Sequence, residues 1–243
     1  MKQFKFLTAV SLMIAVFLMA CNNADEKKET GTTTAAKDSN STKTPEPPAF
    51  KLFNVLVVIH KVASYSKWLP LYESDDSARK ANGLNNYVIG RGIGNDSNTV
   101  MVAMRMADVA KAKAMAGSPQ LKEKMKQGGV TGAPSIFYAE NVVMDTATIP
   151  TMNRVMITHK VKDFDAWKKE FDSHKQTRMD AGLIDRVIGH DVDDNHLVRL
   201  VFAITDMEKA KAFMASKDLK DKMAAAGVEG PPTIFYYTIA KKY

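Results

Sequence analysis

The sequence has a single cysteine, Cys21, so no disulfide can form within the chain and no second thiol is available for catalysis. After residue 20 it also lacks any apolar run of about 20 residues, the length that a membrane-spanning helix needs. Its formal charge of +7 comes from lysines spread along the chain, with no patch rich in arginine and aromatic residues. Nucleic-acid binding is therefore poorly supported.

The first twenty residues resemble a bacterial lipoprotein signal peptide. Two lysines precede an apolar run from Phe6 to Met19, which is too short to span a bilayer comfortably. Leu18-Met19-Ala20-Cys21 resembles a lipobox, which implies cleavage before Cys21, attachment of a diacylglyceryl group to its sulfur, and acylation of the new N-terminus. Several acyl chains would anchor the protein stably to a lipid bilayer. An ordinary secretory signal with a chance cysteine is the alternative.

Residues 21–50 are rich in polar residues and end in Pro45-Glu46-Pro47-Pro48, which predicts a disordered tether behind the lipidated Cys21. Asn22 stands where an aspartate is typical of inner-membrane retention, so we expect a location at the outer membrane, on its periplasmic or surface face. Loss of residues 1–20 lowers the formal charge to +5, because two lysines leave with them.

The rest of the chain is one unit written twice, over residues 51–147 and 152–243. Such a repeat decides the architecture and is sought first. The pairs of residues that recur in the same order include His60/His159, Trp68/Trp167, Arg79/Arg178, Gly83/Gly182, Gly90/Gly189, Asp108/Asp206 and Tyr138/Tyr236.

Hydrophobic periodicity predicts the same elements in both repeats. Residues 54–62 and 153–161 are rich in β-branched residues, as strands are. Aromatic residues then follow at helical spacing until Gly83 and Gly182, which end the helices. Two further strands, a helix that starts after Asp108 or Asp206, and a last strand complete each unit. The order is βαββαβ, a ferredoxin-like α+β unit.

The third strand of the second repeat has two usable faces. One face is apolar, whereas the other mixes Leu197, Arg199, Val201 and Ala203. Helices cover only one side of such a sheet. Two sheets packed through their bare faces would bury the mixed residues inside a barrel.

The string His159-Lys160-Val161-Lys162-Asp163-Phe164, continued by Trp167, Phe171, His174 and Arg178, resembles small members of the dimeric α+β barrel superfamily. That group includes antibiotic-biosynthesis monooxygenase-like and haem-degrading proteins. The resemblance implies two tandem ferredoxin-like units that form an intramolecular pseudo-dimeric barrel in a monomeric chain.

Several side chains are candidates for a ligand site. His60 and His159 could be ligands or general bases, or else core histidines hydrogen-bonded to the next helix. Trp68 and Trp167 could wall a flat aromatic ligand, or else anchor a helix to its sheet.

The two repeats differ around Arg79 and Arg178. Asp75 precedes Arg79 by four residues and could pair with it, but His174 takes that place before Arg178. Arg178 is then either free for an anionic or carbonyl-bearing ligand or paired by local rearrangement. Because residues particular to one repeat can form an asymmetric site, His174, Arg178 and His190 are the preferred ligand-binding candidates.

Neither a metal nor a cofactor is predicted. His190, His196 and the aspartates between them are explained by turn chemistry, and Met101, Met104 and Met106 are good core fillers. The resemblance implies Asn, Trp and Arg sets in the barrel for cofactor-free monooxygenases and an axial histidine near the second helix for haem degradation. Neither set aligns here.

We therefore expect a lipid-anchored, non-enzymatic module of the cell envelope that binds a small anionic or aromatic ligand or a partner. The alternative is a cofactor-independent monooxygenase-like or isomerase-like enzyme that acts on an aromatic small molecule in the barrel. A pocket lined by Trp68 or Trp167, with a histidine or arginine at its end, would favour the enzyme.

Overall fold

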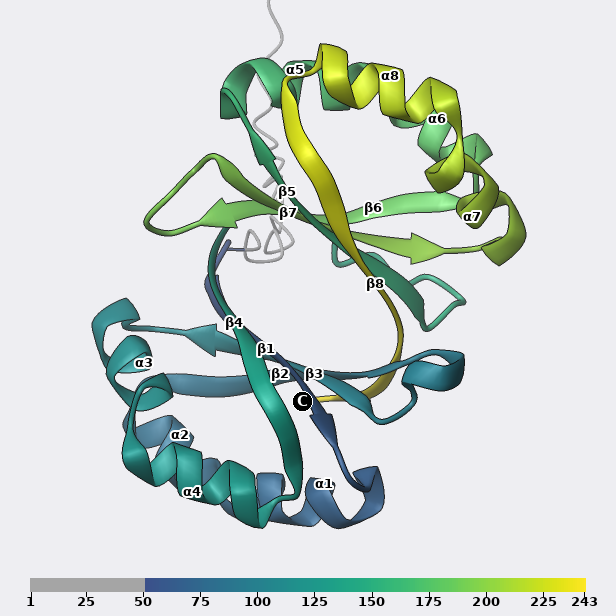
Figure 1. The fold of residues 1–243 in the computed structure, drawn as a ribbon. Coiled ribbons are helices and arrows are strands. Elements are labelled where there is room, and N and C mark those ends of the chain that lie inside the picture. Colours follow the sequence, from purple (N-terminus) through teal and green to yellow (C-terminus); the bar gives the residue numbers. More distant parts are fainter. Residues whose placement is uncertain (1–50) are drawn as a thin grey trace, which may run out of the picture. The chain divides into compact units, whose positions relative to one another are not determined.

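Each repeat folds as the βαββαβ unit that its hydrophobic periodicity predicts (Figure 1). The structure, a computed structural model, describes residues 51–243; the predicted signal peptide, Cys21 and tether lie outside the described residues. The elements of the first repeat are β1 (Asn54–Val62), α1 (Tyr65–Ser74), α2 (Asp76–Ala81), β2 (Leu84–Gly92), the 3-10 helix η1 (Gly94–Asp96), β3 (Thr99–Met106), α3 (Val109–Ala116), α4 (Pro119–Gln127) and β4 (Val130–Met144). Those of the second are β5 (Asn153–Val161), α5 (Phe164–Ser173), α6 (Lys175–Asp180), β6 (Leu183–Asp191), β7 (Leu197–Ile204), α7 (Met207–Ala215), α8 (Lys217–Ala225) and β8 (Val228–Lys242).

The eight strands form one closed antiparallel barrel in the order β1-β3-β2-β8-β5-β7-β6-β4. The last strand of each repeat, 15 residues long, pairs first with its own repeat and then with the other. Thus β4 continues onto β6, where Met144 faces Val187, and β8 continues onto β2, where Tyr237 faces Gly92. The predicted pseudo-dimeric α+β barrel is confirmed, and the exchange of β4 and β8 holds it closed.

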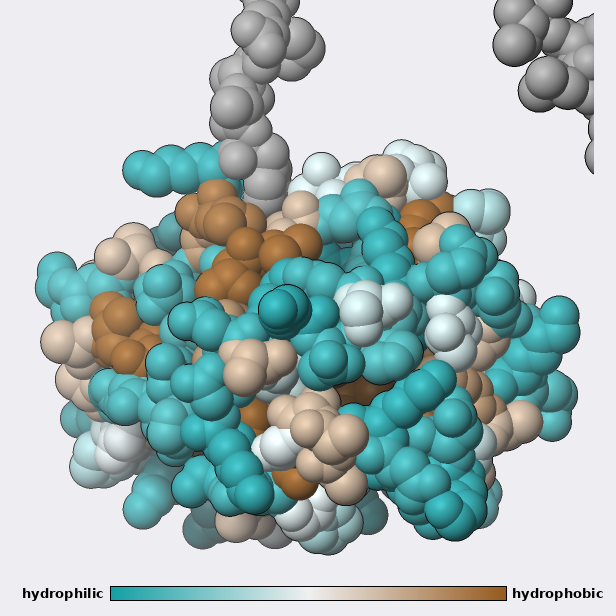
Figure 2. All heavy atoms as spheres, turned by 90° about the horizontal axis from the view of Figure 1, so that it is seen from above, coloured by the Kyte–Doolittle hydropathy of each residue, from teal (hydrophilic) through white to brown (hydrophobic). Residues whose placement is uncertain are grey.

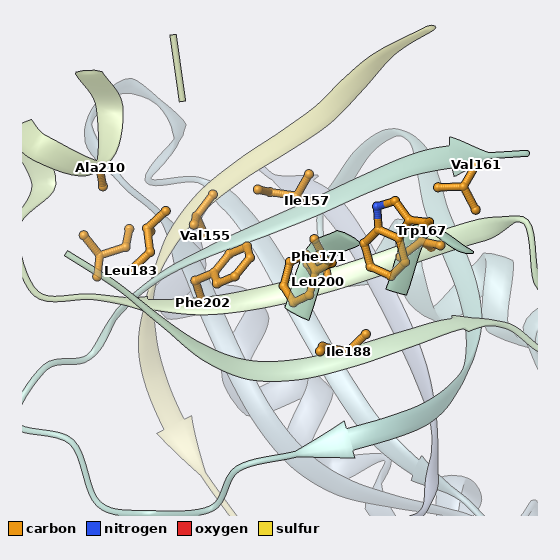
Figure 3. Packing of buried hydrophobic residues seen from close by; sticks show 12 residues of the cluster. Val155, Ile157, Val161, Trp167, Phe171, Leu183, Ile188, Leu200, Phe202 and Ala210 are labelled. Carbon is orange, nitrogen blue, oxygen red and sulfur yellow. The ribbon is translucent and has the colours of Figure 1, made fainter. Parts of the chain in front are cut away.

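Three apolar cores follow from this arrangement. The helices of each repeat lie outside its own strands (Figure 1), with one core beneath them in each repeat and a third inside the barrel. Strand β7 takes part in two of them, as its pattern predicts. Leu200 and Phe202 pack beneath the helices (Figure 3), whereas Val201 packs inside the barrel.

The helix starts agree with the sequence signals. Asp108 accepts a hydrogen bond from the backbone N–H of Lys111 at 3.0 Å, and Asp206 accepts one from the backbone N–H of Lys209 at 3.0 Å.

The predicted aromatic helices, however, are each divided in two. At Asp75 and His174 the backbone leaves the helical region, with ψ of 14° and 16°. The short helices α2 and α6 that follow carry the buried Arg79 and Arg178.

The face seen in Figure 2 is mostly hydrophilic, with apolar groups between the polar side chains. Among residues 51–243, no helix combines the length and the apolar character that crossing a membrane requires.

Candidate functional site

Each repeat has a cleft between its helices and the outer face of its sheet. The cleft of the first repeat has a volume of about 110 Å³, and that of the second about 90 Å³. Both clefts share a histidine from the first strand, a tryptophan and a second aromatic residue from the first helix, and an arginine from the short helix. These are His60, Trp68, Tyr72 and Arg79 in the first cleft and His159, Trp167, Phe171 and Arg178 in the second.

The tryptophans are fixed by stacking. Residues four apart on a helix lie on one face, so Trp68 stacks on Tyr72 with ring centroids 4.9 Å apart. Trp167 stacks on Phe171 in the same way at 5.1 Å (Figure 3). Each tryptophan also lies 5.5 Å from the histidine of its cleft. Both indoles are buried, so they anchor helix to sheet and form a cleft wall at the same time.

The cleft histidines are buried without hydrogen-bond partners. His60 is 5% exposed and His159 6% exposed, and no ring nitrogen of either contacts a partner among the described residues. The expected hydrogen bond to the next helix is therefore wrong. Burial lowers the pKa of both imidazoles from 6.5 to about 4, so they are neutral at pH 7. Each presents one N–H donor and one free acceptor nitrogen.

These histidines predict a loss of stability in acid. A histidine in the unfolded chain has a pKa near 6.5, so between pH 6.5 and 4 the unfolded chain binds protons that the folded chain does not bind. The free energy of unfolding is therefore largest above pH 6.5. It decreases as the pH falls from 6.5 to 4, by about 3 kcal/mol for each histidine. Urea unfolding from pH 7.5 to 4.5 is expected to show this slope, and a His60→Phe/His159→Phe variant is expected to lose most of it. His196→Gln is the matched control, and an unchanged slope in the double variant would contradict the assignment.

Arg178 is fully paired. Its Nε and Nη2 donate to the two carboxylate oxygens of Asp185 at 2.9 and 2.7 Å, and its Nη1 donates to the carbonyl oxygen of Phe171 at 2.5 Å. Its Cζ lies 3.5 Å from the centre of the Phe171 ring. Arg178 is therefore not free for a ligand. It is paired by a local rearrangement, the second alternative, in which Asp185 supplies the carboxylate that position 174 lacks.

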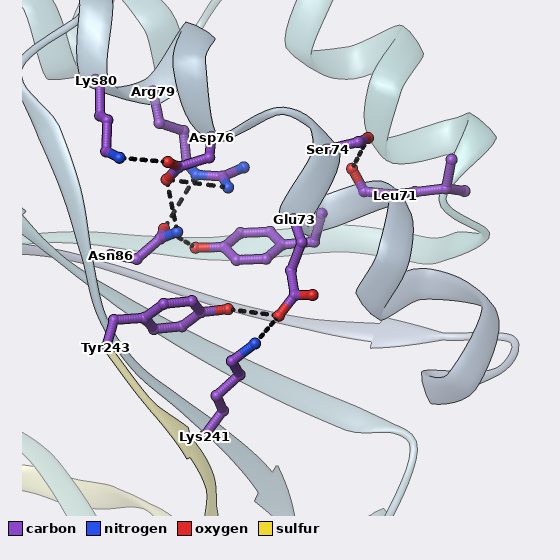
Figure 4. A network of polar contacts seen from close by, with 10 residues as sticks. Leu71, Glu73, Ser74, Asp76, Arg79, Lys80, Asn86, Lys241 and Tyr243 are labelled. Carbon is purple, nitrogen blue, oxygen red and sulfur yellow. Dashed lines mark hydrogen bonds and ion pairs between the residues drawn. The ribbon is translucent and has the colours of Figure 1, made fainter.

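Arg79 is the less satisfied arginine. It does not pair with Asp75, which instead contacts Lys124 at 3.5 Å. Its Nε donates to the Asn86 side-chain oxygen at 3.1 Å, an oxygen that also accepts from the Tyr72 hydroxyl at 2.6 Å. Nη2 is buried, lies 3.8 Å from Asp76, and has no hydrogen-bond partner among residues 51–243 (Figure 4). Of the two cleft arginines, Arg79 is therefore the one with an unpartnered donor.

The remaining candidates are dispersed. His174 lines the second cleft, but its Nδ1 is 2.9 Å from the carbonyl oxygen of Glu170. His190 packs edge-on against Phe164 at 5.0 Å and lines neither cleft. The structure thus brings His159, Trp167, His174 and Arg178 together in one cleft and His60 with Trp68 in the other. The described residues hold no group of three or more His, Cys, Asp or Glu that could bind a metal ion.

No family model matches this chain, and no curated relative matches it either. Solved structures do match. An anthrone oxidase-like protein aligns with a TM-score of 0.55 and 12% identity, over 79% of this chain and 93% of that one. A protein described as a monooxygenase from Fusobacterium nucleatum aligns with a TM-score of 0.51 and 12% identity, over 79% and 94%. A protein described as a chlorite dismutase aligns with a TM-score of 0.50 and 14% identity, over 79% and 96%.

At such identities the likeness shows the fold. This chain has the dimeric α+β barrel fold. The names of these proteins contradict the prediction of a non-enzymatic module and favour the enzyme alternative. The structure also meets the condition set for that alternative, because a pocket walled by tryptophan, histidine and arginine is present in each repeat.

Haem does not fit the clefts of this α+β barrel. An engineered cavity of roughly 150 Å³ holds a single benzene ring, and the first cleft has about 110 Å³. The indole of Trp68 lies against the imidazole of His60, with ring centroids 5.5 Å apart, and takes up space beside it. The chemistry below therefore uses this chain's own residues.

Proposed function

We propose that this protein is a cofactor-independent oxygenase that acts on a single-ring phenol in the cleft of the first repeat. One observation carries the proposal: His60 is buried beside Trp68 with both ring nitrogens unpartnered, at the wall of a cleft. A buried polar group without a partner is unfavourable in itself. A ligand hydroxyl would satisfy it.

The volume of the cleft selects the size of the substrate. The space of about 110 Å³ is smaller than the roughly 150 Å³ of a cavity that encloses benzene, so it admits at most one six-membered ring. The name of the anthrone oxidase-like structure suggests an electron-rich phenol as substrate class, and the cleft favours a smaller member of that class. Trp68 and Tyr72 stack on each other and both line the cleft, so they supply an aromatic wall for a bound ring.

The charges of the cleft suit a phenolate. Neutral His60 has a free acceptor nitrogen for the phenol proton, although burial holds its pKa at about 4. A phenolate formed beside it raises that pKa again, because opposite charges close together favour both charged forms. Arg79 also lines the cleft, and its positive charge favours an anionic ligand there. Deprotonation makes the ring electron-rich enough to react with dioxygen.

The reaction balances without a cofactor. The phenol O–H proton passes to His60, and the carbon para to that oxygen forms a bond to dioxygen. The peroxide anion takes the proton back from His60 to give a hydroperoxide. The hydroperoxide then loses the proton on the same carbon while its O–O bond breaks, and the hydroxide that leaves combines with that proton as water. The products are a para-quinone and one water, so one phenol consumes one dioxygen. The second cleft has the same unpartnered histidine, His159, but there Asp185 and Phe171 already occupy the donors of Arg178, so we assign the reaction to the first cleft.

The two tryptophans allow a direct test, because each cleft holds one. Trp167→Phe leaves Trp68 as the single indole. We expect 2-methoxyphenol to quench its fluorescence saturably and to be converted to a quinone with equimolar oxygen uptake. His60→Phe is expected to lower turnover by at least about 100-fold, the contribution of a general base, whereas His159→Phe is the matched control and should retain it.

Three outcomes would contradict the proposal. Oxygen uptake could survive in His60→Phe, quenching could appear in the Trp68→Phe variant and vanish in Trp167→Phe, or hydrogen peroxide could replace water as the product. The last result would indicate an oxidase acting by electron transfer alone.

We also propose that the enzyme works at a bacterial outer membrane. The lipobox-like residues 18–21 and the polar stretch that follows support a lipid anchor at Cys21, which stays a prediction from the sequence. An anchored enzyme would act on phenols in the cell envelope.

A further inference from the structure

A separate cavity lies inside the barrel. It has a volume of about 330 Å³, and the strands separate it from the two clefts, which lie on the outer faces of the sheets. Such a volume is within the range of small-molecule sites, roughly 300–1,000 Å³. Apolar side chains supply much of its wall, including Val55, Val57, Met101, Met156 and Val201.

Arg199 of β7 lines this cavity as a buried cation without a hydrogen-bonded partner. It is 4% exposed, and none of its three guanidinium nitrogens has a hydrogen-bond partner among the described residues. Its Cζ lies 4.2 Å from the centre of the Phe137 ring. Burial lowers the pKa of Arg199 to about 10, against the opposing effect of the Asp191 carboxylate, so it remains charged at neutral pH. A buried charge without a hydrogen-bonded partner is strongly unfavourable.

The charged residues of the cavity wall are mostly basic. Arg154 is 5% exposed and donates its Nη1 to the carbonyl oxygens of Thr151 and Asn153, at 2.8 and 2.9 Å. Arg154, Arg186, Arg199 and Lys242 line the cavity, whereas Asp145 is its single acidic wall residue among residues 51–243. Arg186 pairs with that acid at 3.1 Å. The lumen is therefore positive and attracts an anion.

The repeat indicates that these arginines are not required by the fold. In the barrel register Arg199 faces Thr158 and Gly189, and its counterpart Met101 faces Ile59 and Gly90. Arg154 corresponds in the same way to Val55, the second residue of its strand. One half of the lumen is thus apolar where the other half is basic.

We propose that the lumen binds an amphiphilic monocarboxylate. Its carboxylate pairs with Arg199, whose planar guanidinium can hold both oxygens. Its hydrocarbon part lies against the apolar half of the wall, at Val55 and Met101. Arg154 lies four residues from Arg199 along the paired strands, roughly 13 Å. The positive charge of Arg154 therefore attracts the carboxylate only weakly, from the far end of the cavity.

Octanoate is the probe for this site. With the full chain, isothermal titration is expected to show one saturable octanoate site, and octanoate is expected to raise the melting temperature. 1-Octanol and sodium chloride, matched for the chain and for a simple anion, should bind more than tenfold more weakly. Arg199→Met introduces the residue of the first repeat and is expected to weaken octanoate binding about 10- to 100-fold. Lys160→Met, an exposed lysine on β5, is the matched control and should leave it unchanged.

The unliganded variants make the result decisive. Because Arg199→Met removes a buried charge that has no hydrogen-bonded partner, the melting temperature of this variant without ligand is expected to stay equal or rise. A lower melting temperature with octanoate binding intact would show that Arg199 serves the fold and would overturn the proposal. Equal binding of octanol or chloride would also overturn it. Arg154→Val, again the residue of the first repeat, is expected to weaken binding by a smaller factor.

Discussion

Residues 152–243 expressed alone are expected to form a dimer. In the intact chain β6 pairs with β4 and β8 pairs with β2, so this fragment loses the partners of two strands. It also exposes the lumen side chains Met156, Val201 and Tyr237 to water. The two repeats are equivalent in topology, so β8 of one copy can pair with β6 of another and close a symmetric barrel.

Sedimentation velocity and thermal unfolding over a range of concentrations test this expectation. The fragment should have twice its chain mass and a melting temperature that rises with concentration, whereas residues 51–243 should be monomeric and show no such dependence. Residues 51–147 should dimerise more tightly than 152–243. In a dimer of residues 51–147, each copy places Val55 and Met101 in the lumen, which is then apolar. In a dimer of residues 152–243, each copy places Arg154 and Arg199 there, so four buried positive charges repel one another. A monomeric fragment with full helix and strand content would contradict the pseudo-dimer.

Asp185→Ala is expected to lower the free energy of unfolding by about 3–5 kcal/mol. The substitution removes the carboxylate that accepts two hydrogen bonds from Arg178 and leaves that guanidinium buried, at 6% side-chain exposure, with only the Phe171 carbonyl. Urea unfolding at pH 7 measures the loss. Asn86→Ala, at the matching position of the first repeat, is expected to cost less, about 1–3 kcal/mol, because Asn86 is neutral.

The double variant Asp185→Ala/Arg178→Met serves as the control. It removes the charge together with its partner, so most of the lost stability should return. If Asp185→Ala alone lowers the free energy of unfolding by less than about 1 kcal/mol, the pair is screened by water and does not organise the second cleft.

Much of the fold could be predicted because its signals are local. The βαββαβ order follows from periodicity, and β7 shows its two faces directly, with Leu200 toward the helices and Arg199 toward the lumen. The division of the aromatic helices at Asp75 and His174 could not be predicted, since neither residue is a helix breaker. That break depends on tertiary packing, which buries Arg79 and Arg178 against the sheet.

The sequence predicts which residues line the clefts, but it gives the wrong repeat for the arginine with a free donor. The helical spacing points to Asp75 and His174, four residues before each arginine. The side chains that pair with Arg79 and Arg178 are instead Asn86 and Asp185, seven residues ahead on the next strand. Sequence spacing does not reveal a contact between a helix and a strand. The sequence does show that Asn86 of the first repeat is replaced by Asp185 in the second. This difference can be interpreted only once the position of the strand relative to the helix is known. The strand pattern places Arg199 on the buried face, but its lack of a hydrogen-bond partner is a property of the closed barrel.

The long pairing of β8 with β2 also orders the events of folding. Closure joins Gly92 to Tyr237, so the barrel cannot be completed until the last fifteen-residue strand is available. Contacts so distant in sequence form slowly, because a large loop must first be closed. In a chain that is made from its N-terminus, the first repeat emerges early with the β2 edge bare and its half of the lumen open. During that interval it resembles an unassembled subunit, with the aggregation risk that an open edge carries.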